Sequence, residues 1–390
     1  MLYALQLSSP LPPACMTRTD LSPFQHACDE LRRHPRSWLV TGAAGFIGSN
    51  LVQELLGLGQ SVVGLDNLTT GYRANLDAAV ALAGPDAGSF RFIEGDIRTL
   101  GDCHAACEGV DLVLHHAAQV SVPGSIADPI LSMRVNVEGF VNVLMAARDG
   151  SVRRIVYASS SAVYGDATTI PQVEQETGRL LSPYAASKAT NELYALVFQG
   201  AYGLETVGLR YFNIFGPRQD PDGAYAAVIP RWISNLLCDV PCQVFGDGLT
   251  SRDFCYVANV VQANILAALT NEPGATGEVY NVACGEETSL NELFSILQGE
   301  LAPFRPEVME LRPQYAPARV GDIRRSAADI GKARTRFGFR PSHDTAAGIR
   351  DAMQWYRTQS DAIVPARAPG TMALHELTPH ALSRSSSSPT

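Results

Sequence analysis

The N-terminal half of this 390-residue chain alternates short apolar, β-branched runs with longer stretches of helical periodicity. This alternation constrains the fold more than any other feature, because strands that alternate with helices form a doubly wound parallel sheet in an α/β domain. Ligands of such a sheet bind beyond the carboxyl ends of its strands. The sequence predicts strands at 37–41, 61–66, 90–96, 110–117 and 154–160, and helices at 46–59, 99–107, 130–149 and 183–202.

The rhythm of strands and helices ends after residue 213, where Pro- and Gly-rich connections join shorter helical segments. This change predicts a second, smaller α/β domain for the substrate. Both ends of the chain lack sustained periodicity and are expected to form tails. The expected organisation is an N-terminal extension at 1–36, a first domain at 37–212 to which 250–270 returns, a second domain at 213–357 and a disordered tail at 358–390.

The composition is that of an ordinary globular protein, with 46% hydrophobic and 18% charged residues. No uninterrupted apolar run reaches the length of about eighteen residues that a membrane helix needs, and the N-terminus does not resemble a signal peptide. We therefore expect a cytoplasmic protein without a membrane partner. The formal net charge of −9 disfavours a nucleic-acid partner, although local arginines can bind a small phosphorylated ligand.

The eight cysteines are scattered along the chain, which is typical of reduced thiols rather than of disulfides. Two pairs, Cys103 with Cys107 and Cys238 with Cys242, have a C-x3-C spacing. Neither pair has a C-x2-C spacing or a second pair of ligands at a fitting distance, so packing roles are favoured and no metal site is expected.

Three glycines, Gly42, Gly45 and Gly48, follow the first predicted strand and lead into a helix. Glycine permits a tight turn, leaves room for a pyrophosphate and lets the helix pack close to the strand. The helix N-terminus, at Phe46-Ile47, adds partial positive charge. The second strand ends at Asp66, whose carboxylate can bind the adenosine ribose and repel a 2′-phosphate. Taken alone the glycines also fit an ordinary turn, but together these features predict a Rossmann-type site that prefers NAD to NADP.

Two further strand ends fit the same ligand. Asp96 and Ile97 follow the third predicted strand, where an adenine ring would lie. His116, Ala117 and Ala118 follow the fourth, with small residues where the dinucleotide must pass. Each group is also compatible with a simple strand cap, and the register with the glycine turn favours the binding interpretation.

Tyr184 and Lys188 are four residues apart in a predicted helix and therefore lie on one face of it. A neighbouring ammonium stabilises phenolate and lowers the pKa of a tyrosine from about 10, which makes Tyr184 a candidate general base. The serines at 159–161 end the fifth predicted strand, where a hydroxyl can bind the same reacting oxygen. The alternatives are a surface lysine and an ordinary serine turn. A serine hydrolase is disfavoured because the chain has no G-x-S-x-G elbow there.

Four motifs together, TGAAGFIGS, SSSAVYGD, SPYAASK and LRYFN, resemble the extended short-chain dehydrogenase/reductases, and within them the UDP-sugar 4-epimerases. The resemblance covers about residues 36–357. The stretches RYFNIFGPRQDPDGAYAAVIPRW and GDGLTSRDFCYV further resemble bacterial enzymes that interconvert UDP-N-acetylglucosamine and UDP-N-acetylgalactosamine, often for surface polysaccharide synthesis. The resemblance implies NAD as a permanently bound cofactor, a UDP-N-acetylhexosamine substrate and a homodimer formed through the helices at 130–149 and 183–202.

By the same resemblance, Ser160, Tyr184 and Lys188 are the catalytic residues. Tyr184 would take the proton of the sugar 4-hydroxyl while C4 passes hydride to the nicotinamide, and the 4-keto sugar would turn over before it is reduced on its other face. The residues implied around the cofactor also include Asn67, Gly71, Asn136, Ser159 and Tyr211. Those implied around the UDP-sugar are Ser121, Asn213, Ala227, Val228, Phe245, Arg252, Arg319 and Arg324.

Three neighbouring functions remain as alternatives. Sugar-nucleotide 4,6-dehydratases carry an Asp-Glu pair directly after the catalytic hydroxyl, whereas Ser161-Ala162 follows Ser160 here. UDP-glucuronate 4-epimerases typically lack the asparagine that stands here as Asn213. A silent dinucleotide-binding protein of the same fold generally lacks the tyrosine or the lysine of the catalytic pair.

Sugar choice is expected to depend on Ser326. The segment GDIRRSAAD resembles the wall of the hexose pocket where epimerases confined to UDP-glucose and UDP-galactose place a bulky tyrosine, and Ser326 stands in that position. A small residue there leaves space for a 2-N-acetyl group. The alternative is that Ser326 only forms the N-cap of a following helix.

Overall fold

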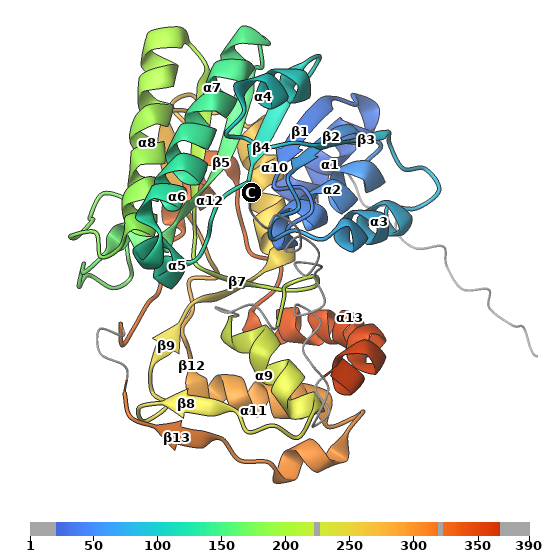
Figure 1. Cartoon of the computed structure of the whole chain (residues 1–390), viewed down its shortest axis with the longest axis vertical. Coiled ribbons are helices and arrows are strands. Elements are labelled where there is room, and N and C mark those ends of the chain that lie inside the picture. The colour runs from blue at the N-terminus through green and yellow to red at the C-terminus, as the bar shows by residue number, and fades with distance from the viewer. Residues whose placement is uncertain (1–20, 222–226, 319–322, 367–390) are drawn as a thin grey trace, which may run out of the picture.

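The computed structural model describes residues 21–221, 227–318 and 323–366. Within these residues, a seven-stranded sheet in the order β11-β6-β5-β4-β1-β2-β3 forms the centre of the larger domain, and all its strand pairs are parallel (Figure 1). This is the doubly wound parallel sheet that the alternation predicts. Its strands are β1 (Ser37–Thr41), β2 (Ser61–Asp66), β3 (Phe90–Glu94), β4 (Leu112–His115), β5 (Arg154–Ser160), β6 (Glu205–Tyr211) and β11 (Glu278–Val282).

The predicted boundaries of β1, β2 and β5 are confirmed residue for residue. Strand β3 ends earlier than predicted because the backbone N–H of Asp96 donates to the carboxylate of Asp102, at 2.8 Å, instead of pairing with a neighbouring strand. Strand β4 is shorter than predicted at both ends. Strands β6 and β11 are not among the predicted ones, and β11 comes from a later part of the chain than the rest of the sheet.

Most helices lie where the periodicity places them. The predicted ranges contain α2 (Phe46–Gly57), α4 (Leu100–Cys107) and α8 (Pro183–Tyr202), while α3 (Arg73–Leu82) was not predicted. The helix predicted at 130–149 is not uniform, since it consists of α6 (Pro129–Met133), a π-helical turn (Arg134–Glu138) and α7 (Gly139–Asp149). Short helices also lie at α5 (Val122–Ala127) and at a 3-10 turn after β5 (Ser161–Tyr164).

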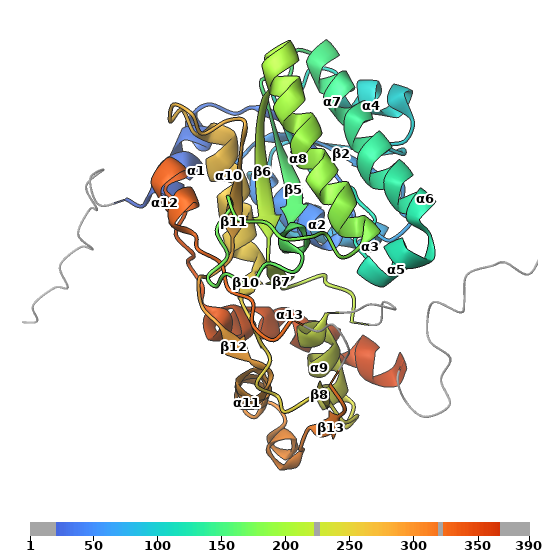
Figure 2. The same cartoon turned by 90° about the vertical axis from the view of Figure 1, so that its left-hand side faces the viewer.

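Apolar cores lie on the two faces of the sheet. Because side chains alternate along a strand, Val40 of β1 packs with Leu55 of α2 and Val260 of α10 (Val257–Leu269) on one face, while Leu39 packs with Phe140 of α7 on the other. Figure 2 shows α4, α7 and α8 on one side of the sheet and α1 (Pro23–Arg33) and α10 on the other. Both faces are therefore covered, as a parallel sheet requires.

One stretch of the described residues, Pro129–Asp149, is long and apolar enough to cross a membrane by length and composition. Almost half of this stretch, 44%, is buried inside the protein. Its buried side chains, among them Phe140, Val143 and Leu144, belong to the core beside the sheet. This burial is typical of a core helix in a globular domain.

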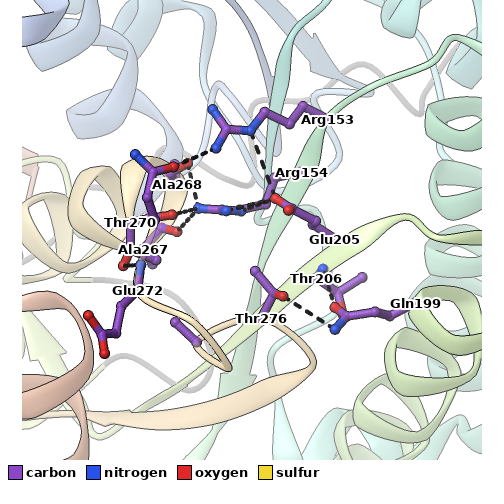
Figure 3. A network of polar contacts seen from close by, with 12 residues as sticks. Arg153, Arg154, Gln199, Glu205, Thr206, Ala267, Ala268, Thr270, Glu272 and Thr276 are labelled. Atoms are coloured by element: carbon purple, nitrogen blue, oxygen red, sulfur yellow. Dashed lines mark hydrogen bonds and ion pairs between the residues drawn. The ribbon is translucent and has the colours of Figure 1, made fainter.

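Helix α10 (Val257–Leu269) lies against the larger sheet, although the chain reaches it only after several elements of the smaller domain. The buried guanidinium of Arg154, at the start of β5, binds the C-terminal end of this helix (Figure 3). Its Nη1 donates to the carbonyl oxygens of Ala267, Ala268 and Thr270 at 3.0, 2.9 and 2.8 Å, and its Nε donates to Glu205 of β6 at 2.9 Å. Carbonyl groups that a helix leaves unpaired at its C-terminus thus gain a charged donor.

The smaller domain gathers around a separate apolar core that includes Trp232, Ile233, Phe294, Leu297 and Tyr356. Short two-stranded pairings connect its parts: β7 with β10 and β8 with β13 are parallel, whereas β9 with β12 is antiparallel. Its elements are β7 (Asn213–Phe215), α9 (Val228–Leu237), β8 (Gln243–Phe245), β9 (Ser251–Arg252), β10 (Phe254–Tyr256), β12 (Thr288–Ser289), α11 (Leu290–Leu301), a 3-10 turn (Pro306–Glu310), β13 (Gln314–Ala316) and α13 (Thr345–Ala366). Helix α12 (Gly331–Phe337) packs beside β11 of the large sheet.

The sequence predicts tails at 1–36 and 358–390, and both expectations are wrong for the residues that form helices. Helix α1 (Pro23–Arg33) begins at a capping box of Ser22 and Gln25, and its Leu31 is fully buried in the core beside α10. The sequence does carry signals of this helix, because a serine and a proline stand at its start and its apolar residues recur at helical spacing. The predominance of polar residues in this stretch led to the prediction of a tail. Helix α13 likewise continues to Ala366.

Candidate active site

The residues expected to bind the cofactor and to catalyse the reaction lie where the parallel strands end. Thr41 of β1 pairs in register with His115 of β4, and Ser160 of β5 pairs with Tyr211 of β6. Strand β2 ends at Asp66, in the same direction. Since all these strands are parallel, the residues that follow them gather at one edge of the sheet, as predicted.

The glycine turn between β1 and α2 has no space for side chains at two of its positions. Gly42 has a φ of +68°, and a Cβ there would lie 2.7 Å from the backbone N of Ala117. A Cβ on Gly48 would lie 2.0 Å from the carbonyl oxygen of Gly42. At Gly45 a Cβ would meet only that same oxygen, at 3.2 Å. The first and third glycines therefore permit close packing, and the second leaves the approach to the helix open.

The N-terminus of α2 carries no side-chain cap, because Gly45 is its N-cap residue. The first N–H groups of a helix have no partner within the helix, and an anion can satisfy them. Phe46 and Ile47, the first helical residues, direct their side chains into apolar packing, Ile47 against the core of the large sheet and Phe46 against that of the smaller domain. Only their backbone groups are left for a phosphate.

Asp66 is the last residue of β2, and its side chain is buried. Its Oδ2 accepts from the backbone N–H of Ala44 at 2.9 Å, and its Oδ1 accepts from that of Leu68 at 2.8 Å. Burial raises the pKa of this carboxyl group, and the two backbone donors oppose the rise. Gly71 packs directly on the glycine turn, since a Cβ there would lie 2.8 Å from Ala44. The carboxylate is thus fixed beside the N-terminus of α2.

Asp96 lies near Asp66 at the end of β3. Its carboxylate accepts from Asn67 Nδ2 at 2.8 Å and from Arg98 Nη2 at 2.6 Å, and these contacts, that of Arg98 above all, hold its pKa well below the usual range. The side chain of Ile97 is buried in the core, so only its backbone can face a ligand.

The segment after β4 is held by Thr41, whose hydroxyl oxygen accepts from the backbone N–H groups of His116 and Ala117 at 3.2 Å each. Ala118 follows, half-buried. The imidazole of His116 is 2.8 Å from the hydroxyl of Tyr211, which accepts from Asn264 at 2.7 Å. Burial lowers the pKa of His116 to about 3, so this ring stays neutral. The contact between His116 and Tyr211 therefore holds the segment after β4 to the end of β6.

Asn136 lies in the π-helical turn and is 1% exposed. Its Oδ1 accepts from the backbone N–H of Gln119 at 2.7 Å, and its Nδ2 donates to Gln119 O and to Ser187 Oγ, both at 3.0 Å. Its own carbonyl accepts from Asn191 of α8 at 2.7 Å. The side chain implied to lie at the cofactor is thus occupied by protein groups, and it links the segment after β4 to α8.

These features fit a dinucleotide. An uncapped helix N-terminus can hold a pyrophosphate, the open face of Gly45 allows it to approach, and a fixed carboxylate at Asp66 can bind a ribose. No group of three or more His, Cys, Asp or Glu side chains suited to a metal ion occurs among the described residues, in which all cysteines are free thiols.

The three predicted catalytic residues come together beside this edge. Tyr184 stands in the first turn of α8, and the hydroxyl of Ser160 at the end of β5 lies near enough to its phenol to affect the pKa of that group. Lys188, one turn further along α8, is 3% exposed and donates from Nζ to the carbonyl oxygen of Ala158 at 2.8 Å. This Nζ is 6.0 Å from the centre of the Tyr184 ring.

The protonation of this pair differs from the expectation. The sequence predicts that Lys188 lowers the pKa of Tyr184, but desolvation raises the pKa of the phenol, and only the contact with Ser160 opposes the rise. Burial also lowers the pKa of Lys188, to about 8. In the protein alone, burial therefore determines the direction of the shift, and the phenol keeps its proton at neutral pH.

Ser159 does not face this site, because its side chain points to the other side of β5. Its hydroxyl donates to Glu192 of α8 at 2.5 Å, and Glu192 forms an ion pair with Arg210 of β6 at 2.8 Å. Neither Glu192 nor Arg210 was predicted as a site residue. The i+4 spacing from Lys188 to Glu192 is the only signal in the sequence that could have pointed to the carboxylate.

Three residues expected to bind the substrate lie side by side in the smaller domain. The backbone N–H and the amide of Asn213 donate to the carbonyl oxygen of Asp253 at 3.2 and 3.0 Å. The N–H of Asp253 donates to the carbonyl oxygen of Ser326 at 2.9 Å, and Arg252 precedes Asp253.

Asp253, fully buried, accepts from the N–H groups of Cys284, Gly285 and Ala328, and burial raises its pKa to about 6. This aspartate, which was not predicted, joins the segments that carry Asn213, Arg252 and Ser326.

The other substrate residues are less closely grouped. Ala227 is the uncapped N-cap residue of α9, which begins at Val228, and Phe245 ends β8. Ser121 caps α5 by accepting from Gly124 N at 2.9 Å. Arg324 is exposed and forms an ion pair with Asp247 at 2.9 Å. Arg319 lies outside the described residues.

Ser326 is not a helix N-cap. It is 9% exposed and precedes an isolated bridge between Ala328 and Gln172, and the next helix, α12, has Ile330 as its N-cap residue. The alternative interpretation of Ser326 is therefore wrong, and its side chain is available for another role.

The sequence matches the NAD dependent epimerase/dehydratase family over residues 38–283. The UDP-glucose 4-epimerase of Mycolicibacterium smegmatis is 38% identical over 325 residues, which cover 83% of this chain and 99% of that protein. The structure is similar to that of a UDP-N-acetylglucosamine 4-epimerase from Methanobrevibacter ruminantium in complex with UDP-N-acetylmuramic acid, with 36% identity, a TM-score of 0.75 and coverage of 83% and 99%. It is also similar to the UDP-glucose 4-epimerase of Thermus thermophilus in complex with NAD, with 35% identity, a TM-score of 0.70 and coverage of 82% and 99%.

The parallel sheet, the glycine turn and the Ser-Tyr-Lys group define an NAD-dependent protein of the extended short-chain dehydrogenase/reductase class. The chain belongs to the NAD-dependent epimerase/dehydratase family, and UDP-sugar 4-epimerases are among its relatives. The family prediction is confirmed, and so is NAD as the cofactor.

Asp66 should determine the choice of cofactor. Replacing Asp66 with Ala removes the group that binds the ribose and repels a 2′-phosphate, so the variant should retain less NAD and discriminate less against NADP. Titration of cofactor-free protein with both dinucleotides measures the two affinities. Asp111→Asn is the matched control, because Asp111 accepts from the backbone of Ser37 at the opposite end of β1. An unchanged preference in Asp66→Ala would place the ribose contact elsewhere.

Proposed function

We propose that this protein is a UDP-sugar 4-epimerase that interconverts UDP-N-acetylglucosamine and UDP-N-acetylgalactosamine. One observation carries the proposal of epimerase chemistry: Tyr184 and Ser160 lie close to each other at the sheet edge that also carries the dinucleotide features. Each of them carries a hydroxyl group. A sugar hydroxyl bound there can exchange its proton with the tyrosine.

The proton chemistry follows from these side chains. In its phenolate form, Tyr184 accepts the proton of the sugar 4-hydroxyl and later returns it, while Ser160 orients the same oxygen. NAD, held by the glycine turn and Asp66, supplies the hydride acceptor and donor for the sugar C4. Lys188 anchors α8 to β5 through Ala158 and holds a positive charge near the phenol ring.

Epimerisation is favoured over elimination because the site lacks an acid and a base in the required place. Loss of water across C5 and C6 needs carboxyl groups beside the catalytic hydroxyl. Here Ser161 and Ala162 follow Ser160 and begin the 3-10 turn, in which the N–H of Ala162 donates to Ser160 Oγ at 3.1 Å. This turn supplies no carboxyl group next to the hydroxyl.

The N-acetylated substrates are favoured by the small side chain of Ser326. Its backbone is fixed to Asp253, next to Arg252, which is expected to bind the UDP moiety. A tyrosine at this position would fill space that a 2-N-acetyl group needs. UDP-glucose and UDP-galactose are the second candidate pair, because a site that admits the larger sugar does not exclude the smaller one.

We further propose that the active form is a homodimer joined through α5, α6 and α8. These helices lie together on one outer side of the larger domain (Figure 2), and their exposed surface is apolar. Leu193, Leu196 and Val197 of α8 are 65%, 57% and 57% exposed, and Ile126 and Ile130 are 62% and 59% exposed. An exposed apolar patch of this kind supports burial against a second copy.

Replacing Tyr184 with Phe should lower kcat by about 10²–10⁴-fold, because the proton acceptor is lost. NAD content should be unchanged. Since the pKa of the phenol is raised, the phenolate fraction and kcat of the wild type should increase with pH through the neutral range, and this dependence should disappear in the variant. Tyr194→Phe, on the exposed side of α8, is the control. Turnover of UDP-sugars that stays within a few-fold of wild type in Tyr184→Phe would reject this assignment.

Replacing Ser326 with Tyr should depress kcat/KM for the N-acetylated substrates far more than for UDP-galactose. The added ring collides only with the acetamide, and a steric clash discriminates more strongly than the loss of one favourable contact, which is worth about 1–3 kcal/mol. Coupled assays on all four UDP-sugars measure the ratio, with Ser326→Thr as the control for a small side chain. Equal losses on both pairs of substrates would show that Ser326 is not the gate.

Replacing Leu196 with Lys should convert the dimer to a monomer, since a charge would be buried in the interface. Light scattering of the purified protein measures the mass. Leu82→Lys on α3, at a position that is 62% exposed, should leave the mass unchanged. A wild-type protein that is monomeric at high concentration would contradict the dimer.

A further inference from the structure

The end of strand β5 is attached to helix α8 at two consecutive residues. Lys188 Nζ donates to the carbonyl oxygen of Ala158 at 2.8 Å, and Ser159 Oγ donates to Glu192 Oε1 at 2.5 Å. The next residue along β5 is Ser160. Tyr184, Lys188 and Glu192 are four residues apart in turn and lie along one face of the helix. The catalytic tyrosine and both attachments thus belong to one side of α8.

Glu192 is itself held rigidly. Arg210 donates from Nε and Nη2 to the two oxygens of this carboxylate, at 2.9 and 2.8 Å, and from Nη1 to the carbonyl oxygen of Glu174 at 2.9 Å. The side chains of Arg210 and Glu192 are only 5% and 15% exposed. Two parallel hydrogen bonds between a guanidinium and a carboxylate fix both position and orientation. Arg210 is also the register partner of Ser159 across strands β5 and β6.

Ser159 cannot touch the reacting atoms, because neighbouring side chains of a strand point to opposite faces. It can act only through the backbone that it shares with Ser160. Ser160 ends β5 and Tyr184 lies in the first turn of α8, so the geometry of the contact between them depends on how these two elements are held. The Ser159–Glu192–Arg210 group links β5, α8 and β6 within one residue of that contact.

We propose that Ser159, Glu192 and Arg210 are positioning residues of the reaction: together they clamp the end of β5 to α8 and so set the distance between Ser160 and Tyr184. This inference rests on the proposed epimerase function. It assigns a role in turnover to a buried ion pair that otherwise would serve stability alone.

The opposite end of β5 and β6 has comparable groups that lie far from the contact between Ser160 and Tyr184. Arg154 and Glu205 form the ion pair of β5 and β6 there, and Arg154 binds the end of α10 (Figure 3). Thr206, 1% exposed, donates from its hydroxyl to the carbonyl oxygen of Ala195 in α8 at 3.2 Å. This hydroxyl, like that of Ser159, attaches the sheet to α8. It lies about 13 Å from the catalytic edge, since four residues of a strand separate Thr206 from Arg210.

The decisive variant is Ser159→Ala, which removes one hydroxyl and leaves the ion pair in place. We expect kcat to fall by up to about 10²-fold, because a displacement of about 1 Å has this effect on a catalytic group. KM and NAD content should stay near the wild-type values. The acidic limb of the kcat profile should move to higher pH, since a weaker contact with Ser160 no longer opposes the raised pKa of Tyr184. Ser159→Thr keeps a hydroxyl and should restore kcat.

The control is Thr206→Val, which removes a hydroxyl of equal burial at the remote end. It should lower the midpoint of thermal unfolding to a similar extent as Ser159→Ala, without a change in kcat or in the pH profile. If Ser159→Ala matched this control in every measurement, the clamp would be purely structural and the inference would be overturned.

Two further measurements keep the outcomes separate. If Ser159→Ala does not fold, Glu192→Asp is the variant to test. It keeps the negative charge beside Arg210 and moves the carboxylate away from Ser159 by one methylene. An unchanged kcat and pH profile in this variant would overturn the proposed clamp. Wild-type protein is assayed in parallel on the UDP-sugars. Absence of wild-type turnover would reject the proposed function, whereas normal wild-type turnover with unaffected variants would reject only the clamp.

Discussion

The close approach of α2 to β1 is the constraint on which the arrangement of the edge depends. Gly48 lies so near the carbonyl oxygen of Gly42 that a single methyl group would separate the helix from the strand. This contact brings the positive end of α2 to the carboxyl ends of β1, β2 and β4. Asp66 then reaches the backbone of Ala44, and the segment after β4 passes directly over Gly42. The position of a dinucleotide relative to Tyr184 follows from this packing.

Around this edge, polar side chains serve mainly to fix the protein. Thr41 and Asn136 have their polar groups occupied by backbone or by neighbouring side chains, and Asp253 accepts three backbone N–H groups. Buried polar groups that are fully bonded make a structure specific, because any displacement would leave them unpaired. Few side chains remain free to meet the ligand, and these are held in place by the others.

The sequence predicts local features well and distant contacts poorly. The glycine turn, Asp66 and the Tyr184–Lys188 pair were found because each is encoded within a few residues of a strand end or along one helix. Glu192, Arg210 and Asp253 were missed, since their roles arise from partners that are distant in the chain. The protonation of Tyr184 was misjudged because charge can be read from a sequence, whereas desolvation depends on the completed fold. The helix at Pro23–Arg33 was missed although its capping box and apolar spacing are encoded locally, because its polar composition was given more weight.

The order of the strands has a consequence for how the protein is made. Strand β11 forms one margin of the large sheet and α10 covers one of its faces, yet both follow elements of the smaller domain in the chain. A ribosome must therefore synthesise the chain beyond Thr270 before Arg154 can bind the carbonyl groups at the end of α10, and beyond Val282 before β11 can pair with β6. Until then, the nascent larger domain exposes an unpaired strand margin and apolar surface, the condition in which a folding chain most needs protection from aggregation. The two domains thus reach maturity together rather than one after the other.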